Sequence, residues 1–124
     1  MKIMGKIKIS KCFFCLMVSF CLYCYLGPVV AGIGVKDSRL DSGKTSGKGH
    51  SEATQISSDG KGCVYAVWED ERNGSKDIYF NHSSDHGMTW QRNDMRLDTG
   101  DVPGKSGSFY PQIKSEGDGY LYVV

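Results

Sequence analysis

Acidic residues are missing from the first 36 positions of this 124-residue sequence, and a long stretch there has no charged residue at all. No Asp or Glu precedes Asp37, and no charged side chain lies between Cys12 and Val35. Residues 1–31 hold four of the 15 basic residues and none of the 14 acidic ones, so the other 93 residues carry 11 basic against 14 acidic side chains, a net charge of −3. This acidic balance excludes a strongly basic nucleic-acid binder, and we expect no nucleic-acid partner.

Cysteine, proline and helical periodicity are also scarce after residue 36. Only Cys63 of the five cysteines and two of the three prolines lie there, and no stretch of useful length has apolar residues at helical spacing. Because a lone cysteine cannot form an intrachain disulfide, we expect packing to hold this part together. Clusters of Trp, Tyr, Phe and Ile disfavour intrinsic disorder.

The N-terminus has the three-part layout of a secretory signal peptide. Basic residues precede an apolar run from Cys12 to Leu26, and Gly27-Pro28 then leads into small residues. This layout predicts a signal over residues 1–31, cleaved after Ala31, and a secreted, periplasmic or cell-surface protein. The competing interpretation is an uncleaved anchor, because the whole uncharged run is long enough for a bilayer core of roughly 30 Å. We expect membrane contact only through this segment, and only if it is uncleaved.

Four cysteines form two C-x-x-C pairs inside the apolar run, namely Cys12, Cys15, Cys21 and Cys24. Such pairs bind zinc in polar surroundings that supply further ligands and a second shell. No His, Asp or basic residue lies within the run to supply them. We therefore expect no metal and no cofactor.

An internal repeat with a period of 57 residues organises the rest of the chain. Arg39–Val67 aligns without gaps on Arg96–Val124, and 14 of the 29 positions are identical. Periods of roughly 40–50 residues made of short strands are typical of β-propeller blades. Gly/Ser-rich stretches at 42–51 and 99–108 account for the extra length as loops between units.

One period predicts four strands in order. The first covers Ala53–Ser57 and turns at a Gly-rich hairpin, the second covers Cys63–Trp68, and the third covers Asp77–Ser83. A fourth strand follows Trp90 and reaches about Leu97. The sequence thus predicts an all-β fold, a propeller of four-stranded blades.

This pattern divides the chain into four segments: a signal peptide (1–31), a lead-in loop (32–52), a first blade (53–98), and an inter-blade loop with a truncated second blade (99–124). Val124 aligns with Val67, inside a strand. Propellers typically have four to eight blades, so we expect an N-terminal fragment of about one and a half blades. Such a fragment is expected to expose unpaired sheet faces and to aggregate.

A specific turn motif follows the third strand, at Ser83, Asp85, Gly87, Thr89 and Trp90. The Asp carboxylate can accept hydrogen bonds from backbone amides further on, and the Ser hydroxyl can close the start of the turn. The glycine supplies backbone freedom, and the indole covers the hairpin. This S-x-D-x-G-x-T-W pattern resembles the Asp-box, or BNR repeat, of sialidase-like (neuraminidase superfamily) propellers. The motif identifies architecture and not chemistry.

The resemblance also suggests catalytic positions. Sialidases bind the sialate carboxylate with three arginines, a role that suits the guanidinium fork. Arg72 matches the second of them and Asp77 the acid/base aspartate, but Gln55-Ile56-Ser57 lacks the first arginine. A charged hairpin that only supports a non-catalytic blade has the same sequence pattern. Both interpretations of Arg72 and Asp77 stay open.

Two functions therefore remain. The first is a secreted propeller that binds glycans, sialoglycoconjugates or proteins as a scaffold module. The alternative is an exo-α-sialidase, which would release terminal sialic acid by retaining hydrolysis with a tyrosine nucleophile. We expect the fragment alone to be inactive. His50, His82 and His86 share no spacing and are expected at the surface.

Overall fold

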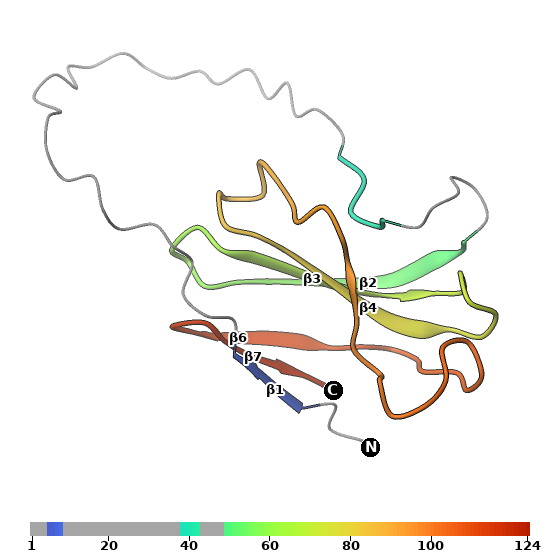
Figure 1. The fold of residues 1–124 in the computed structure, drawn as a ribbon. Coiled ribbons are helices and arrows are strands. Elements are labelled where there is room, and N and C mark those ends of the chain that lie inside the picture. Colours follow the sequence, from blue (N-terminus) through green and yellow to red (C-terminus); the bar gives the residue numbers. More distant parts are fainter. Residues whose placement is uncertain (1–4, 9–37, 43–48) are drawn as a thin grey trace, which may run out of the picture.

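The computed structural model describes residues 5–8, 38–42 and 49–124, and these residues form an all-β structure of antiparallel sheets. None of them belongs to a helix of the length and hydropathy that a membrane span requires. Figure 1 shows two stacked sheets, with the strands of the second lying beneath those of the first.

The first sheet contains four strands in the order β2-β3-β4-β5. They are β2 (Ser51–Ser58), β3 (Val64–Asp70), β4 (Asp77–Ser83) and β5 (Met95–Arg96). The predicted third strand has the bounds of β4, and the second prediction differs from β3 by one residue at its start and two at its end. β2 begins two residues earlier than expected, and β5 is a short pairing opposite Tyr79 and Phe80.

The second sheet has the order β1-β7-β6. It combines β6 (Ile113–Gly117) and β7 (Tyr120–Val123) with β1 (Gly5–Lys8), which pairs with the free edge of β7. β1 belongs to the predicted signal peptide, whose residues 1–4 and 9–31 lie outside the described residues. The signal and its cleavage site therefore stay predictions.

The repeat is visible in the pairing of the two sheets. β2 pairs with β3 as β6 pairs with β7, and the Cα partners in each hairpin differ by 57 at both members. The first hairpin pairs Ile56 with Ala66, Ser57 with Tyr65 and Ser58 with Val64; the second pairs Ile113 with Val123, Lys114 with Tyr122 and Ser115 with Leu121. Sequence identity over the repeat therefore corresponds to the same local structure.

Apolar side chains fill the space between the sheets. Leu121 and Val123 of β7 are 0% and 1% exposed and pack on one face of the first sheet. That face is formed by Cys63, Tyr65, Val67, Ile78 and Phe80. Since each fully buried aliphatic or aromatic side chain contributes about 1.5–3 kcal/mol, this layer is the main apolar core.

The opposite face of the first sheet has a smaller cluster. Ala66, Trp68 and Tyr79 are buried there, and Leu40 and Trp90 pack against them. Trp90 thus brings the Asp-box turn onto this face. Alternation along β3 explains the division, because successive side chains of a strand point to opposite faces.

Two expectations need correction. Cys63 is disulfide-bonded, so it is not the lone thiol that the sequence suggested; its partner lies outside the described residues. His82 is half-buried and stacks with Tyr65 and Phe80, with ring centroids 6.5 and 5.9 Å away. Its position on β4 directs the imidazole into the sheet interface, and burial lowers its pKa.

Candidate functional site

Charged side chains gather at the end of the first sheet where β3 and β4 are joined. The connection is a tight turn around Asn73-Gly74, with Gly74 at a φ of 122° that favours glycine. Glu69, Asp70 and Asp77 lie at the adjoining strand ends and are at most 1% exposed. Buried carboxylates require partners, and this end of the sheet supplies them.

Arg72 lies between two carboxylates of the chain itself. Its Nη2 donates to Asp70 Oδ2 at 2.6 Å, and its two terminal nitrogens donate to both oxygens of Asp94 at 3.0 and 2.8 Å. The guanidinium carbon lies 3.9 Å from the centre of the Tyr79 ring, a cation–π contact. The side chain is 17% exposed, so most of the guanidinium is withdrawn from solvent.

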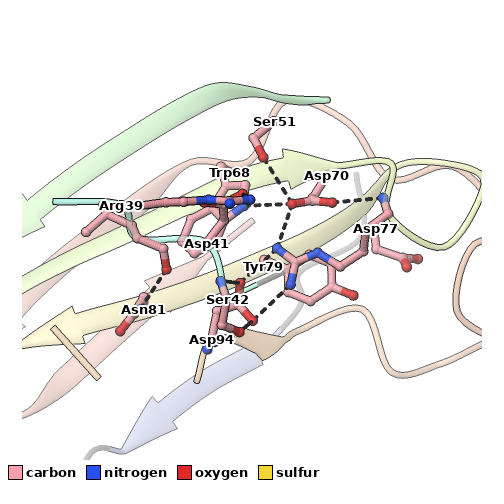
Figure 2. A network of polar contacts seen from close by, with 12 residues as sticks. Arg39, Asp41, Ser42, Ser51, Trp68, Asp70, Asp77, Tyr79, Asn81 and Asp94 are labelled. Carbon is pink, nitrogen blue, oxygen red and sulfur yellow. Dashed lines mark hydrogen bonds and ion pairs between the residues drawn. The ribbon is translucent and has the colours of Figure 1, made fainter. Parts of the chain in front are cut away.

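The two carboxylates have further partners (Figure 2). Ser51 Oγ donates to Asp70 at 3.0 Å, while the amide and hydroxyl of Ser42 donate to Asp94 at 2.9 and 2.5 Å. Ser42 lies 52 residues before Asp94, so this contact joins the lead-in segment to the loop before β5. The network therefore connects three separate segments of the chain.

Electrostatics keep this network ionised. Burial raises the pKa of Asp70 and of Asp94, but the hydrogen bonds and charge of Arg72 outweigh it, and both pKa values are lowered. Burial lowers the pKa of Arg72, and its two carboxylate partners more than reverse this, so the pKa is raised. Neither carboxyl is therefore a proton donor near neutral pH.

Asp77 is fully buried, with 0% exposure. Its carboxylate accepts from Asn73 Nδ2 at 3.0 Å and from the Gly104 amide, which lies 3.1 Å from both oxygens. Arg96 Nε lies 3.2 Å from Asp77 Oδ1 and also pairs with Asp98. Asp77 thus connects the β3–β4 turn to the loop that leads into the second repeat.

Glu69 makes a second connection between the repeats. Its Oε1 accepts from the Tyr110 amide at 2.6 Å, and Lys76 Nζ lies 3.0 Å from its Oε2. Lys76 also pairs with Glu52. Tyr110 has a φ of 55°, which costs an L residue of this size about 1–3 kcal/mol. The buried carboxylate holds this backbone in place.

The Asp-box turn is built differently, from short-range hydrogen bonds. Asp85 accepts from the amide and hydroxyl of Thr89 at 2.8 and 2.6 Å, and Ser83 Oγ accepts from the Gly87 amide at 2.9 Å. Gly87 has a φ of 84°, and Trp90 Nε1 donates to its carbonyl at 3.1 Å. Hydrogen bonds from Thr89 and Ser83 lower the pKa of Asp85 to about 2.

Two exposed aromatic rings lie next to the charged end of the sheet. Phe109 and Tyr110 are 57% and 82% exposed, and their ring centroids are 6.4 Å apart. Lys76 Nζ lies 5.7 Å from the centre of the Phe109 ring. Both rings therefore lie largely in solvent beside Lys76.

The arrangement places Arg72 and Asp77 at the same end of the sheet, but in separate networks. Arg72 contacts Asp70 and Asp94, whereas Asp77 contacts Arg96 and Gly104. Ser83, Asp85, Gly87, Thr89 and Trp90 lie together in the turn after β4. No group of three or more potential metal ligands occurs within the described residues.

Sequence reasoning gave no role to several members of the networks, among them Arg96, Gly104, Glu69 and Asp94. Arg96 and Gly104 carry a signal, since they repeat Arg39 and Gly47 at the 57-residue offset. Asp94 likewise repeats Asp37 at this offset. Glu69 lies outside the repeated segment, and only the fold brings it to Tyr110.

Comparison of the chain with protein-family models, with curated proteins and with solved structures finds no match in any of the three.

Proposed function

We propose that the chain is part of a secreted, sialidase-like Asp-box propeller whose role is to bind glycans or proteins, and not to hydrolyse them. The complete Asp-box, the 57-residue repeat and the stacked antiparallel sheets support the propeller assignment. The main observation in favour of binding over hydrolysis is that Arg72 already has partners within the chain. Its hydrogen bonds go to Asp70 and Asp94, so its guanidinium is committed to the chain's own carboxylates.

The environment of Asp77 supports the same proposal. A general acid must reach a substrate oxygen directly or through one water, whereas Asp77 has no exposed surface. Its oxygens accept from Asn73 and Gly104 and lie beside Arg96, so they are already occupied by partners within the chain. Asp77 is thus suited to holding the second repeat in place.

The proposed contact residues for a ligand are Phe109 and Tyr110. Aromatic rings provide broad apolar surfaces for a sugar ring, and the Tyr hydroxyl adds a polar group. Lys76 lies 5.7 Å from the Phe109 ring centre, but its ammonium is paired with Glu69 and Glu52, so the proposed contact rests on the two rings. The surface is therefore suited to sugar rings, those of sialylated glycans among them.

The binding test uses immobilised sialylated oligosaccharides and the full chain. We expect Tyr110→Ala to weaken binding and Met88→Ala to leave it unchanged, because Met88 is comparably exposed, at 76%, but lies on the Asp-box turn. Equal binding by wild type and Tyr110→Ala contradicts this contact surface.

The sialidase alternative is tested with a fluorogenic α-sialoside. We expect no release of the fluorophore by wild type or by Asp77→Asn. Release by wild type that Asp77→Asn abolishes, with unchanged thermal stability, would establish the hydrolase and reject the binding proposal.

Export by residues 1–31 is the second part of the proposal. A chain cleaved after Ala31 and an intrachain disulfide at Cys63 exclude each other, because the other four cysteines all precede residue 31. Sequencing the N-terminus of the exported protein decides between them. A first residue of Gly32 supports cleavage, and retention of Met1 supports the uncleaved anchor.

A further inference from the structure

The two repeats carry apolar residues at equivalent positions, but among the described residues a second sheet covers them only in the second repeat. In the second repeat, Leu121 and Val123 are buried against the first sheet, and Leu97 and Ile113 pack at the same interface. Each of these four residues has an apolar equivalent, 57 positions earlier, on the outer face of the first sheet. The equivalents are Leu40, Ile56, Val64 and Ala66.

Exposure differs sharply within one equivalent pair. Ile113 is half-buried and packs against the core between the sheets, whereas Ile56 is 66% exposed. The two isoleucines also pair with equivalent residues of the adjoining strands. Ile113 pairs with Val123, and Ile56 pairs with Ala66. The local structure is therefore the same, and the difference is that no sheet in the described part of the chain covers Ile56.

The backbone conformation is also the same at one pair of equivalent positions. Ala53 and Tyr110 both have left-handed φ values, 50° and 55°. The Tyr110 conformation is held by its hydrogen bond to Glu69 of the neighbouring sheet. Ala53 carries this conformation at the start of the exposed strand β2, so the first repeat has the backbone geometry that contacts a neighbouring unit.

We propose that the outer face of the first sheet, centred on Ile56 and Val64 beside the part that Leu40 and Trp90 already cover, binds the second sheet of another copy of this chain. The face offered by that copy is the one turned away from its own first sheet. Tyr122 and Val124 point there, because Leu121 and Val123 point inward. They are the equivalents of Tyr65 and Val67, which contact Leu121 and Val123 within one chain.

The two faces are different, so this contact is head-to-tail. A heterologous contact of this kind forms a ring if its rotation closes and a filament if it does not. Each copy contributes two stacked sheets, and association continues the same sheet-on-sheet packing from one copy to the next. The association is independent of glycan binding.

Sedimentation of the full chain over a wide range of concentrations tests the proposal. Wild type is expected to self-associate, and Ile56→Asp to weaken association at least about tenfold, because a carboxylate would be desolvated at the interface. Met88→Asp is the matched control, since Met88 is 76% exposed on the Asp-box turn. A wild type that stays monomeric, or equal effects of the two substitutions, overturns the proposal.

A mixing experiment tests the head-to-tail geometry. Ile56→Asp removes one face and Val124→Asp removes the other, so neither variant alone should associate. An equimolar mixture should form heterodimers, because each variant keeps the face that the other lacks. Absence of heterodimers, with both variants folded by circular dichroism, contradicts the head-to-tail contact; Ile56→Ser repeats the test without an added charge.

Discussion

The Asp-box turn and the charged end of the first sheet both use carboxylates to organise backbone, but over different distances. Asp85 accepts from Thr89, four residues away and exposed to solvent. Asp77 accepts from Gly104, 27 residues away and in the loop that leads to the second repeat. The turn therefore fixes a local conformation, whereas the charged end holds the two repeats together. Loss of a carboxylate should cost more at the second place.

The largest effect is expected for Asp77→Ala. The substitution removes a carboxylate partner of the mostly buried Arg96, and it also removes the acceptor of the Gly104 amide. Breaking a buried ion pair typically costs about 3–5 kcal/mol, and we expect a loss of about 3 kcal/mol in the free energy of unfolding. Urea denaturation of the full chain measures it. An Asp77→Asn protein that loses as much would show that charge, and not shape, is decisive, because Asn keeps the shape of Asp.

Gly104→Ala is expected to be nearly as damaging. A Cβ at this position would lie 1.9 Å from the carbonyl oxygen of Asn73, and the φ is 70°. Gly60 has the same φ with nothing within 4 Å of the added Cβ, so Gly60→Ala measures the conformational cost alone, about 1–2 kcal/mol. Thermal denaturation of both variants should show the larger fall for Gly104→Ala. Equal falls would mean that the two loops do not approach closely.

Arg72→Lys should have an intermediate effect. An ammonium group cannot donate in parallel to both oxygens of Asp94 while reaching Asp70, and it loses the planar contact with Tyr79. We expect a loss of about 1–2 kcal/mol in urea denaturation. A double-mutant cycle with Asp94→Asn should show coupling between the two sites, and strict additivity would argue against the ion pair.

The smallest effect concerns pH and the Asp-box. The pKa of Asp85 is about 2 in the folded chain against an ordinary value of 3.8. A lowered folded-state pKa gives stability that is complete above the ordinary value and is lost as the pH falls toward 2. The urea midpoint of wild type should therefore approach that of Asp85→Asn over this range. A difference that stays constant down to pH 2 contradicts the assignment.

The sequence predicted the strands and the repeat because both depend on local patterns. The alternation in Asp77–Ser83 and the apolar run around Val67 mark β4 and β3, and the 57-residue offset anticipated the shared pairing of Ile56 and Ile113. The charged end could not be predicted in the same way. Glu69 meets Tyr110 only after the sheets stack, and Asp94 meets Ser42 only when the lead-in segment packs on the first sheet, so no spacing in the sequence indicates these contacts.

β1 and His82 show the same limit. The pairing of Gly5–Lys8 with β7 joins the two ends of the described chain, whereas the sequence interpretation took its alternating Lys and Ile residues as the basic start of a signal peptide. His82 lies in a polar stretch of sequence, yet its neighbours across the sheet, Tyr65 and Phe80, surround the ring. Long-range packing, and not local propensity, determines both.

Amide hydrogen exchange at Tyr110 and Thr89 tests most directly whether buried carboxylates hold the second repeat on the first. In wild type both amides should be protected, by Glu69 and by Asp85 respectively. Glu69→Ala should abolish the protection of Tyr110 and leave that of Thr89 unchanged. An unprotected Tyr110 amide in wild type, or one that stays protected in Glu69→Ala, would contradict the account.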